Sequence, residues 1–396
     1  MPSVKLMKDL AVAGKRVLVR VDYNVPMDKG AVTDDTRMRA SLPTINYLLG
    51  NKARVILMSH LGRPKGQVNP KYSLAPVAQH LSQLLKKPVA FAPDCVGLAA
   101  EKAAQSLKDG DVLLLENLRF HPEEEANDAG FAKKLASLAD VFVQDAFGSV
   151  HRAHASTEAV AHLLPSGAGF LLEKELAFLG RIRENPAKPF VSLVGGAKVS
   201  DKIEVLDKLL DKVDTLAIGG AMAYTFLTAM GVPVGNSLVE KDKTGLAKSL
   251  MDKAKAKNVA LLLPKDHVVV KSIDDPASAK NTDGQAIPDG YVGVDIGPGS
   301  LERLTAPLAQ AKTVFWNGPM GIFEVDRYAE GTRGVAKLAA AAAQRGATVV
   351  VGGGDSVAAV QATGLADKIT HISTGGGASL EFLEGKDLPG VAVLRK

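Results

Sequence analysis

The 396-residue sequence contains one cysteine, Cys95. A single cysteine cannot form a disulfide within the chain, which excludes the disulfide-stabilised class of small secreted domains. The composition fits a reducing compartment, and we expect a cytoplasmic protein. We interpret Cys95 as a packing residue, because an isolated thiol mostly behaves as a small apolar side chain.

Long apolar runs are also absent, and no stretch approaches the roughly 20 residues of a membrane span. The first ten residues, MPSVKLMKDL, lack the apolar region of a secretory signal. Aromatic residues are only 5% of the chain, and the net charge of +5 is not concentrated in runs of Lys and Arg. Nucleic-acid surfaces need clustered basic residues or stacking aromatics. We therefore expect neither a membrane nor a nucleic acid as partner.

Two common nucleotide-binding motifs are missing. The sequence has no G-x-x-x-x-G-K-[ST], which excludes a P-loop enzyme. Gly352-x-Gly354 begins a G-x-G-x-x-G pattern, but Val357 stands where its third glycine belongs. An NAD(P)-dependent oxidoreductase stays open as an alternative, and titration with a nicotinamide cofactor would test it.

Short apolar runs alternate with helical patterns along the whole chain, which predicts an α/β fold with parallel sheets. A chain of this length suggests two domains. The predicted strands are residues 16–21, 54–58, 111–115 and 140–144 in the first half, and 190–194, 215–218, 260–263, 313–316, 347–351 and 370–373 in the second.

A helical spacing of apolar residues over 169–184, ended by Asn185, Pro186 and Pro189, predicts a connecting helix. We expect two doubly wound, Rossmann-like parallel-sheet domains, residues 1–168 and 185–387, joined by that helix and a hinge. The tail 388–396 is too short for a further domain, and we expect it to pack back on the N-terminal domain.

In the first half, each of four predicted strands leads to an arginine: Arg37, Arg63, Arg119 and Arg152. The carboxyl ends of parallel strands lie at one edge of a sheet, so these side chains are expected to meet there with His60 and His151. Guanidinium groups bind phosphate and carboxylate oxygens in pairs, which indicates a small, highly anionic ligand. Each arginine alone has the alternative of a surface ion pair. Asp22 and Asn24 suit either a ligand hydroxyl or the turn before Pro26.

In the second half, strands repeatedly end in glycines. The clearest case is the apolar run 349–351, followed by Gly352, Gly353, Gly354, Asp355 and Ser356. Glycines before a helix let backbone N–H groups approach an anion, and Asp355 beside them favours a phosphate chain that carries Mg²⁺. The alternative is that Asp355 or Ser356 only caps the helix. Lys198 and Lys202 are one helical turn apart and could bridge phosphates or lie on a solvated face.

These segments together resemble the phosphoglycerate kinase family. The resemblance lies in residues 20–26, 59–64, 116–122, 151–154, 195–202, 316–324, 352–356 and 374–380, which follow one another in the family's order. Tyr23 and Ser356 are mild departures, since Phe and Thr are common there. The resemblance implies reversible phosphoryl transfer from 1,3-bisphosphoglycerate to Mg-ADP, giving 3-phosphoglycerate and ATP without a phosphoenzyme.

The resemblance also implies roles for individual residues. The phosphoglycerate would be held by Asp22, Asn24, Arg37, His60, Arg63, Arg119 and Arg152. The nucleotide would be held by Lys202, Gly293, Asn317, Glu324, Gly353, Gly354, Asp355 and Ser356, with the surface near Gly219, Gly220 and Val294 taking the adenine. Asp355 would bind Mg²⁺, and the transferring group would be stabilised by Arg37, Lys198 and the helix N-termini after Gly354 and Gly376.

We further expect a monomer that bends around residues 184–190 when both substrates are bound. The remaining rival class is an anion-binding or scaffold protein in which the arginines only hold a ligand. Failure to bind ADP would support that rival.

Overall fold

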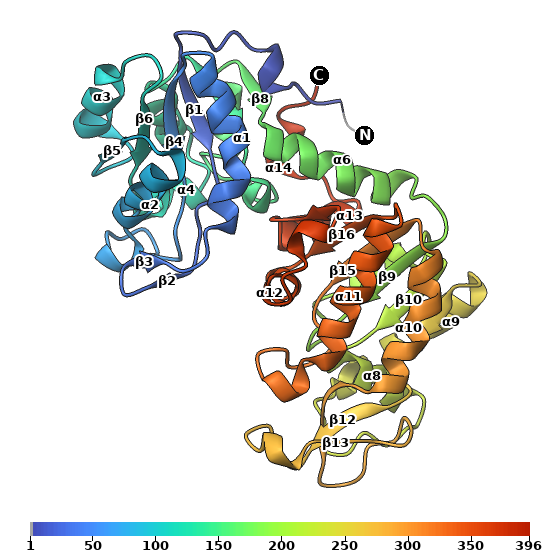
Figure 1. The fold of residues 1–396 in the computed structure, drawn as a ribbon. Coiled ribbons are helices and arrows are strands. Elements are labelled where there is room, and N and C mark those ends of the chain that lie inside the picture. Colours follow the sequence, from blue (N-terminus) through green and yellow to red (C-terminus); the bar gives the residue numbers. More distant parts are fainter. Residues whose placement is uncertain (1–2) are drawn as a thin grey trace. The chain divides into compact units, whose positions relative to one another are not determined.

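The computed structural model describes residues 3–396, and none of its helices in that range is both long enough and apolar enough to cross a membrane. The chain forms two compact units (Figure 1). The first unit runs to Ala177 and includes Lys386–Lys396, and the second is Phe178–Gly385. The division falls inside helix α6 (Phe170–Glu184), which occupies the segment where the apolar spacing predicts a helix.

The first unit is built on a six-stranded parallel sheet of order β5-β6-β4-β1-β7-β8. Its strands are β1 (Arg16–Arg20), β4 (Arg54–Met58), β5 (Val89–Ala92), β6 (Val112–Leu115), β7 (Val141–Gln144) and β8 (Ser166–Ala168). Its other helices are α1 (Thr36–Gly50), α2 (Ala75–Leu85), α3 (Gly97–Ser106), α4 (Pro122–Glu125), α5 (Ala129–Ala136) and α14 (Pro389–Ala392). A short antiparallel hairpin, β2 (Met27–Asp28) and β3 (Ala31–Val32), follows β1.

Alternating side chains of the strands build two cores in this unit. On β1, Val17 and Val19 face the core shared with α1 and α2, and Leu18 faces the core shared with α3 and α5. Both faces of the sheet are therefore covered, which is why its strands are apolar almost throughout. Local sequence fixes some helix ends: the Asp128 side chain accepts a hydrogen bond from Phe131 N at the start of α5 (2.7 Å).

The last residues belong to the first unit. Lys5 N donates to Leu394 O (2.8 Å), Lys396 N donates to Ser3 O (2.9 Å), and Gly390 N donates to Val150 O (2.9 Å). Leu388, Val391 and Leu394 are buried. These contacts fasten the segment that contains α14 to parts of the chain more than 200 residues earlier in sequence.

The second unit holds another six-stranded parallel sheet, of order β11-β10-β9-β15-β16-β17. Its strands are β9 (Phe190–Val194), β10 (Thr215–Ile218), β11 (Ala260–Leu262), β15 (Thr313–Asn317), β16 (Thr348–Gly352) and β17 (His371–Ile372). Its helices are α7 (Ile203–Leu209), α8 (Met222–Ala229), α9 (Thr244–Ala256), α10 (Pro298–Gln310), α11 (Glu330–Gln344), α12 (Gly354–Ala362) and α13 (Gly377–Glu384). Counted along the chain, the strand order is the 3-2-1-4-5-6 of a doubly wound sheet.

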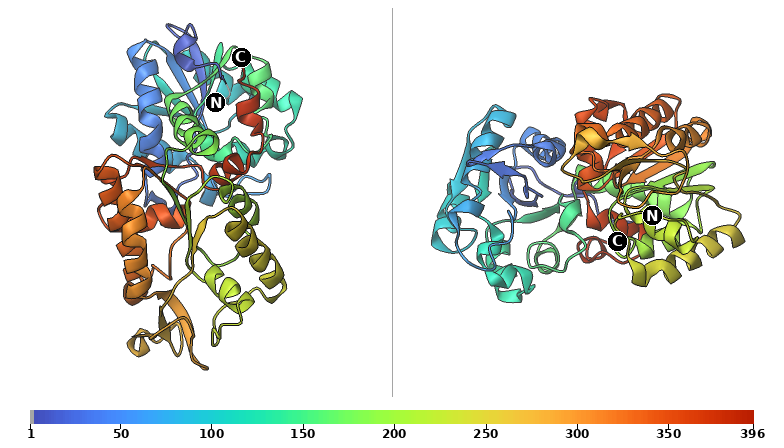
Figure 2. Two further views of the ribbon diagram at one scale, coloured as in Figure 1. Left: turned by 90° about the vertical axis from the view of Figure 1, so that its right-hand side faces the viewer. Right: turned by 90° about the horizontal axis from the view of Figure 1, so that it is seen from below.

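One face of this sheet carries Val191, Val314, Trp316, Val349 and Val351, which pack with apolar residues of α10, α11 and α12. Figure 2 shows the sheet nearly edge-on in its left view, with α10 and α11 on one side and α8 and α9 on the other. Helices on both faces make this unit, like the first, a doubly wound α/β structure, and the predicted fold class is confirmed.

The ten strands predicted from sequence are all present, with ends displaced by at most two residues. The sequence reasoning missed β5, β8 and the hairpin β2–β3, together with a small antiparallel sheet in the second unit. That sheet consists of β12 (His267–Val270), β13 (Lys280–Asn281) and β14 (Val292–Ile296). Its strands are separated by turn-rich segments with Asp, Pro and Gly, which obscure the alternation of side chains.

Candidate active site

In the first unit, the segments that carry the predicted anion-binding residues meet at one edge of the sheet. Strands β6, β4, β1 and β7 are neighbours and all run parallel, so the four segments that follow them emerge side by side. The order of the strands reverses between β1 and β7, which is where open α/β sheets bind ligands. The prediction of a shared edge is therefore confirmed.

Asp22 and Asn24, directly after β1, position Arg37 at the start of α1. Arg37 Nη1 donates to both carboxylate oxygens of Asp22 (3.2 Å each) and to Asn24 O (3.1 Å). Asn24 Oδ1 accepts from Gly62 N (2.9 Å), which ties this turn to the segment after β4. The two residues thus act as positioning groups for Arg37 as well as turn formers.

Arg119 lies in the short 3-10 helix after β6 (Leu118–Phe120) and is buried. Its Nη1 donates to Gly62 O (2.9 Å), and its Nε lies 3.2 Å from Glu125 Oε1 without hydrogen-bond geometry. Burial lowers the pKa of Arg119; Glu125 opposes this shift, while Arg152 and Arg63 add to it. Arg63 and Arg152 are therefore each close enough to Arg119 to act on its charge, and an anionic ligand would relieve this repulsion.

His60 is buried beside the same arginines. Arg20 Nη2 lies 3.1 Å from His60 Nδ1, and because a guanidinium only donates, Nδ1 must accept and Nε2 must carry the proton of the neutral ring. Burial and the charges of Arg20, Arg119 and Arg37 hold the pKa of His60 well below its usual value. Similar causes lower the pKa of His154 to about 4. At neutral pH the positive charge of this site therefore comes from arginines, and His60 supplies a single N–H.

Arg20 was not identified as a site residue from the sequence, because it lies inside the predicted buried strand 16–21. It is almost fully buried and donates from Nε to Ser156 Oγ (2.8 Å) and from Nη1 to Val21 O. Ser156 in turn donates to the buried carboxylate of Glu124 from Oγ (2.5 Å) and from N (3.0 Å). The sequence did contain one sign of its role, since Arg20 stands between Val19 and Val21 in a predicted buried strand. A charge buried there is rarely left without a partner.

In the second unit, the strand order reverses between β9 and β15, and the predicted phosphate-binding residues lie beyond these strands and β16. Lys202 Nζ donates to the side-chain oxygen of Asn317 and to Asn317 O (3.2 Å). Asn317 Nδ2 donates to Gly352 O (2.9 Å), and Gly318 N donates to Ser356 Oγ (2.5 Å). Desolvation lowers the pKa of Lys202 to about 8, although Asp355 and Asp201 act in the opposite direction.

An open cavity of about 340 Å³ adjoins these residues, and it is lined by Gly220, Tyr224, Leu238, Ile273, Gly293, Val294, Met320, Glu324 and Asp355 among others. Its apolar walls include the exposed side chains of Leu238 and Ile273. A Cβ on Gly293 would lie 2.2 Å from Tyr224 Oη, and one on Gly219 would lie 2.3 Å from Met320 Sδ. These two glycines allow the walls of the cavity to pack closely, because a side chain at either position would clash.

Gly354 and Gly376 are different, because no atom lies within 4 Å of a Cβ built on either residue. Gly354 begins α12, and Gly376 precedes α13 with φ of +52°. Among the residues that the structure describes, no side chain caps the N-terminus of either helix, so neither has a side-chain partner for its first-turn N–H groups at the N-cap. Asp355 is exposed in the first turn of α12 and does not act as its cap.

A family model described as phosphoglycerate kinase matches residues 7–386. The chain belongs to the phosphoglycerate kinase family. It is 55% identical to the phosphoglycerate kinase of Chlorobaculum tepidum over 98% of this chain and 99% of that protein. It is 57% identical to cytosolic phosphoglycerate kinase 3 of Arabidopsis thaliana over 99% of this chain and 98% of that protein. The solved phosphoglycerate kinase of Coxiella burnetii superposes with a TM-score of 0.87 at 42% identity, covering 99% of this chain and 98% of that one.

Among the residues that the phosphoglycerate kinase resemblance singles out, contacts join Asp22, Asn24 and Arg37. Arg119 is close enough to His60 to lower its pKa, and Arg63 and Arg152 act on Arg119 in the same way. In the second unit, hydrogen bonds join Lys202 to Asn317, and the cavity brings together Gly220, Gly293, Glu324 and Asp355. Lys198 is exposed on the segment between β9 and α7, beside the cavity-lining Ala197.

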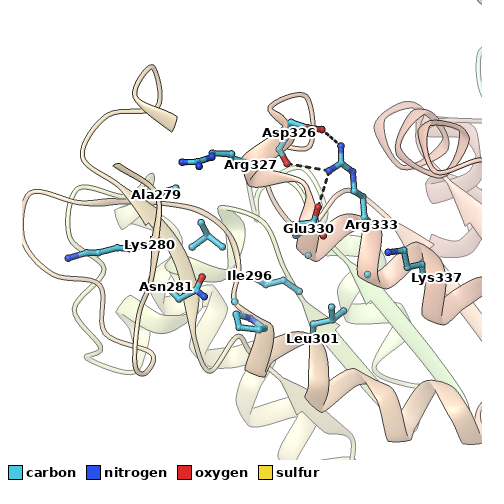
Figure 3. A pocket seen from close by; sticks show the side chains of 15 residues that line it. Ala279, Lys280, Asn281, Ile296, Leu301, Asp326, Arg327, Glu330, Arg333 and Lys337 are labelled. Carbon is cyan, nitrogen blue, oxygen red and sulfur yellow. Dashed lines mark hydrogen bonds and ion pairs between the residues drawn. The ribbon is translucent and has the colours of Figure 1, made fainter. Parts of the chain in front are cut away.

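A larger cavity of about 750 Å³ lies elsewhere in the second unit (Figure 3). It is bounded by β13, β14 and the start of α11, and it contains none of the residues that the phosphoglycerate kinase resemblance identifies. Arg333 points toward Asp326 and Glu330 and pairs with both, the latter at 2.9 Å. We favour the smaller cavity as the nucleotide site, because it lies at the carboxyl edge of the parallel sheet and is bounded by the glycine turns.

Proposed function

We propose that this chain catalyses reversible transfer of the acyl phosphate of 1,3-bisphosphoglycerate to Mg-ADP, giving 3-phosphoglycerate and ATP. The observation that carries the proposal is the group of arginines at the edge of the first sheet, where guanidinium charges outnumber their carboxylate partners. Such a site suits a small ligand with several anionic groups. Membership of the phosphoglycerate kinase family supplies the identity of that ligand.

In this proposal the first unit binds the phosphoglycerate. Arg63, Arg119 and Arg152 would neutralise its phosphate, and His60 would donate its Nε2–H to a substrate oxygen. Arg37 is fixed by Asp22 and Asn24, so it would meet the transferring group without first losing much side-chain freedom. The buried chain from Arg20 through Ser156 to Glu124 would hold His60 in the required tautomer.

The second unit would bind the nucleotide. The apolar walls near Gly219, Gly220, Gly293 and Val294 suit a flat adenine ring, and Glu324 would accept from the ribose hydroxyls. Asn317, Lys202 and residues Gly353–Ser356 would contact the phosphates, with first-turn N–H groups of α12 pointing at them. Lys202 already points at an amide oxygen, so a phosphate oxygen would replace a contact of the same geometry.

Asp355 would bind the Mg²⁺ that accompanies the nucleotide. Its carboxylate is exposed beside the cavity and is close enough to Lys202 to act on the pKa of that lysine. One carboxylate together with phosphate oxygens and waters is a usual Mg²⁺ ligand set, so these residues fit the ion. The ion would neutralise phosphate charge during transfer.

The transfer itself would be direct and in line, with no covalent enzyme intermediate. Its loose transition state needs positive charge around the moving phosphoryl group more than a nucleophilic side chain. Lys198, Arg37 and the N-termini of α12 and α13 at Gly354 and Gly376 would supply that charge. We also expect a monomer in the cytoplasm; the name of the Arabidopsis relative supports the compartment, and sedimentation would test the oligomeric state.

A coupled assay tests the proposal. ATP formation from ADP and 1,3-bisphosphoglycerate is measured at increasing Mg²⁺, with a parallel reaction in which a chelator removes the ion. We expect turnover only with all three components present. ATP formation that is absent at saturating substrates and Mg²⁺ would overturn the assignment.

A further inference from the structure

Asp94, Cys95 and His121 form a group of potential metal ligands outside the proposed active site. Asp94 and Cys95 follow β5, and His121 follows the 3-10 helix that carries Arg119. One ligand atom from each residue, an Asp94 oxygen, Cys95 Sγ and a His121 ring nitrogen, lies within 4.8 Å of the other two. The proposed reaction uses none of these three side chains.

We propose that these three residues bind a thiophilic divalent metal ion such as Zn²⁺. Thiolate, imidazole and carboxylate are the usual protein ligands of Zn²⁺, and three protein ligands plus one water complete a tetrahedral site. Zn–S and Zn–N bonds of about 2.3 and 2.0 Å place neighbouring ligand atoms about 3.3–3.8 Å apart. The ligand atoms here lie within 4.8 Å of one another, so small side-chain rotations would bring them to these separations.

The surroundings provide both a fixed ligand and an entrance. Cys95 is fully buried, and its own N–H donates to Asp94 Oδ1 (2.7 Å), which holds the two ligands together. The side chains of Asp94 and His121 are 46% and 28% exposed, so an ion can reach the thiol from solvent between them. The His121 ring packs 5.2 Å from the Phe131 ring, which limits its rotation.

Without metal, His121 Nε2 lies 2.7 Å from Asp94 Oδ1, and this hydrogen bond alone accounts for that pair. The Cys95 thiol lies beside that pair, at the edge of the apolar core to which it belongs. In the bound state the ion takes the place of the shared proton, and the neutral His121 ring carries its proton on Nδ1 so that Nε2 gives its lone pair to the ion. The Cys95 thiol loses its proton to solvent. The ion would join the segment after β5 to the segment that positions Arg119.

Co²⁺ is the probe for the test, with untagged full-length protein. A cobalt–thiolate bond gives a sulfur-to-metal charge-transfer band, and Cys95 is the only cysteine in the chain, so that band identifies the site without any mutation. We expect one equivalent of Co²⁺ to produce the band together with the visible bands of tetrahedral Co²⁺. Zn²⁺ should then displace the cobalt and raise the unfolding temperature.

Variants test the other two ligands. His121→Gln and Asp94→Asn should each weaken Co²⁺ binding by about tenfold or more, and Cys95→Ser should lose the charge-transfer band. His162→Gln is the matched control, because His162 Nε2 pairs with Glu158 Oε1 (2.6 Å) in a partly exposed His–carboxylate pair away from any cysteine. Absence of the band in the unmodified protein at saturating Co²⁺, or equal affinity of His121→Gln and the parent, would overturn the site.

Discussion

Lys202 is a half-buried ammonium whose pKa is lowered to about 8 by desolvation. Bound phosphate favours the charged form and raises that pKa, so protonated Lys202 binds ADP better than neutral Lys202. We expect the affinity for ADP to be constant below pH 8 and to fall as pH rises above it, by up to about tenfold per pH unit. Calorimetry at several pH values measures this. Lys202→Arg should remove the dependence, and Lys208→Arg, on the exposed face of α7, should keep it.

Lys198 differs from Lys202 because it is exposed, and it follows Ala197, which lines the cavity. If it meets only the moving phosphoryl group, Lys198→Ala should lower kcat by about 10²–10³-fold while the Kd for ADP changes little. Steady-state kinetics and calorimetry on the same preparation separate the two quantities. Equal losses in kcat and in affinity would assign Lys198 to ordinary nucleotide binding.

Arg63 is exposed, and none of the hydrogen bonds or ion pairs described for residues 3–396 involves its side chain. Arg63→Ala should weaken 3-phosphoglycerate binding by about 10–100-fold, since charged hydrogen bonds contribute about 1.5–3 kcal/mol each. The affinity for ADP should not change. Arg39→Ala is the control, because Arg39 is an exposed arginine on α1 that already pairs with Asp35 (2.8 Å). A comparable loss of ADP affinity in Arg63→Ala would contradict the proposed roles of the two units.

At the scale of elements, Asp145 holds the start of α6. Its Oδ1 accepts from Leu171 N (2.9 Å) and Leu172 N (3.2 Å), and its Oδ2 has no hydrogen-bond partner within residues 3–396. Burial raises the pKa of Asp145 to about 8, although Thr44 and the two backbone N–H donors act to lower it. The folded protein therefore keeps a proton on this carboxyl that the unfolded chain releases near pH 4.

The sign of the effect on stability follows from that difference. Between about pH 4 and pH 8 the folded state binds the extra proton, so the contribution of Asp145 to the free energy of unfolding falls as pH rises, by up to about 1.4 kcal/mol per pH unit. Asp145→Asn should remove this contribution, which urea titrations of the parent and the variant from pH 5 to pH 8 measure as a difference between their slopes. Asp140→Asn is the matched control: hydrogen bonds from Arg16 outweigh burial and lower the pKa of Asp140, so its contribution is lost only as pH falls below about 4. Neutral His60 and His154 contribute slopes of the opposite sign, so the parent slope alone does not decide the matter. Identical slopes in the parent and in Asp145→Asn would argue against a neutral Asp145.

Sequence pattern predicted the parallel sheets well because buried parallel strands are continuous apolar runs. Strands β9 (190–194) and β16 (348–352), for example, are recognisable in the sequence because Val and Leu dominate them. Strand β8, Ser-Gly-Ala, has no such content, and it is a strand because β7 offers it a partner. The expectation that the four arginines share one edge of the sheet followed from the prediction that its strands are parallel. The network from Arg20 to Glu124 joins residues more than 100 positions apart, and no local pattern encodes that pairing.

At the scale of the whole molecule, the proposed reaction requires the acyl phosphate and the attacking ADP oxygen to come within about 3–3.5 Å. We expect bending around residues 184–190 to achieve this when both substrates are bound. Small-angle scattering should then give the smallest radius of gyration with both ligands, and a smaller decrease with either one alone. An unchanged radius would reject the hinge while leaving the kinase assignment intact.

The return of the final segment to the first unit has a consequence for biosynthesis. Leu394 bonds to Lys5, so the partner of one of the earliest residues leaves the ribosome only after the entire second unit has been made. The second unit is continuous in sequence and can fold as it emerges, whereas the nascent first unit must wait with the apolar sites of Leu388, Val391 and Leu394 unfilled. During that interval we expect an apolar patch to stay exposed on the first unit, and it is covered when Leu388, Val391 and Leu394 pack into place.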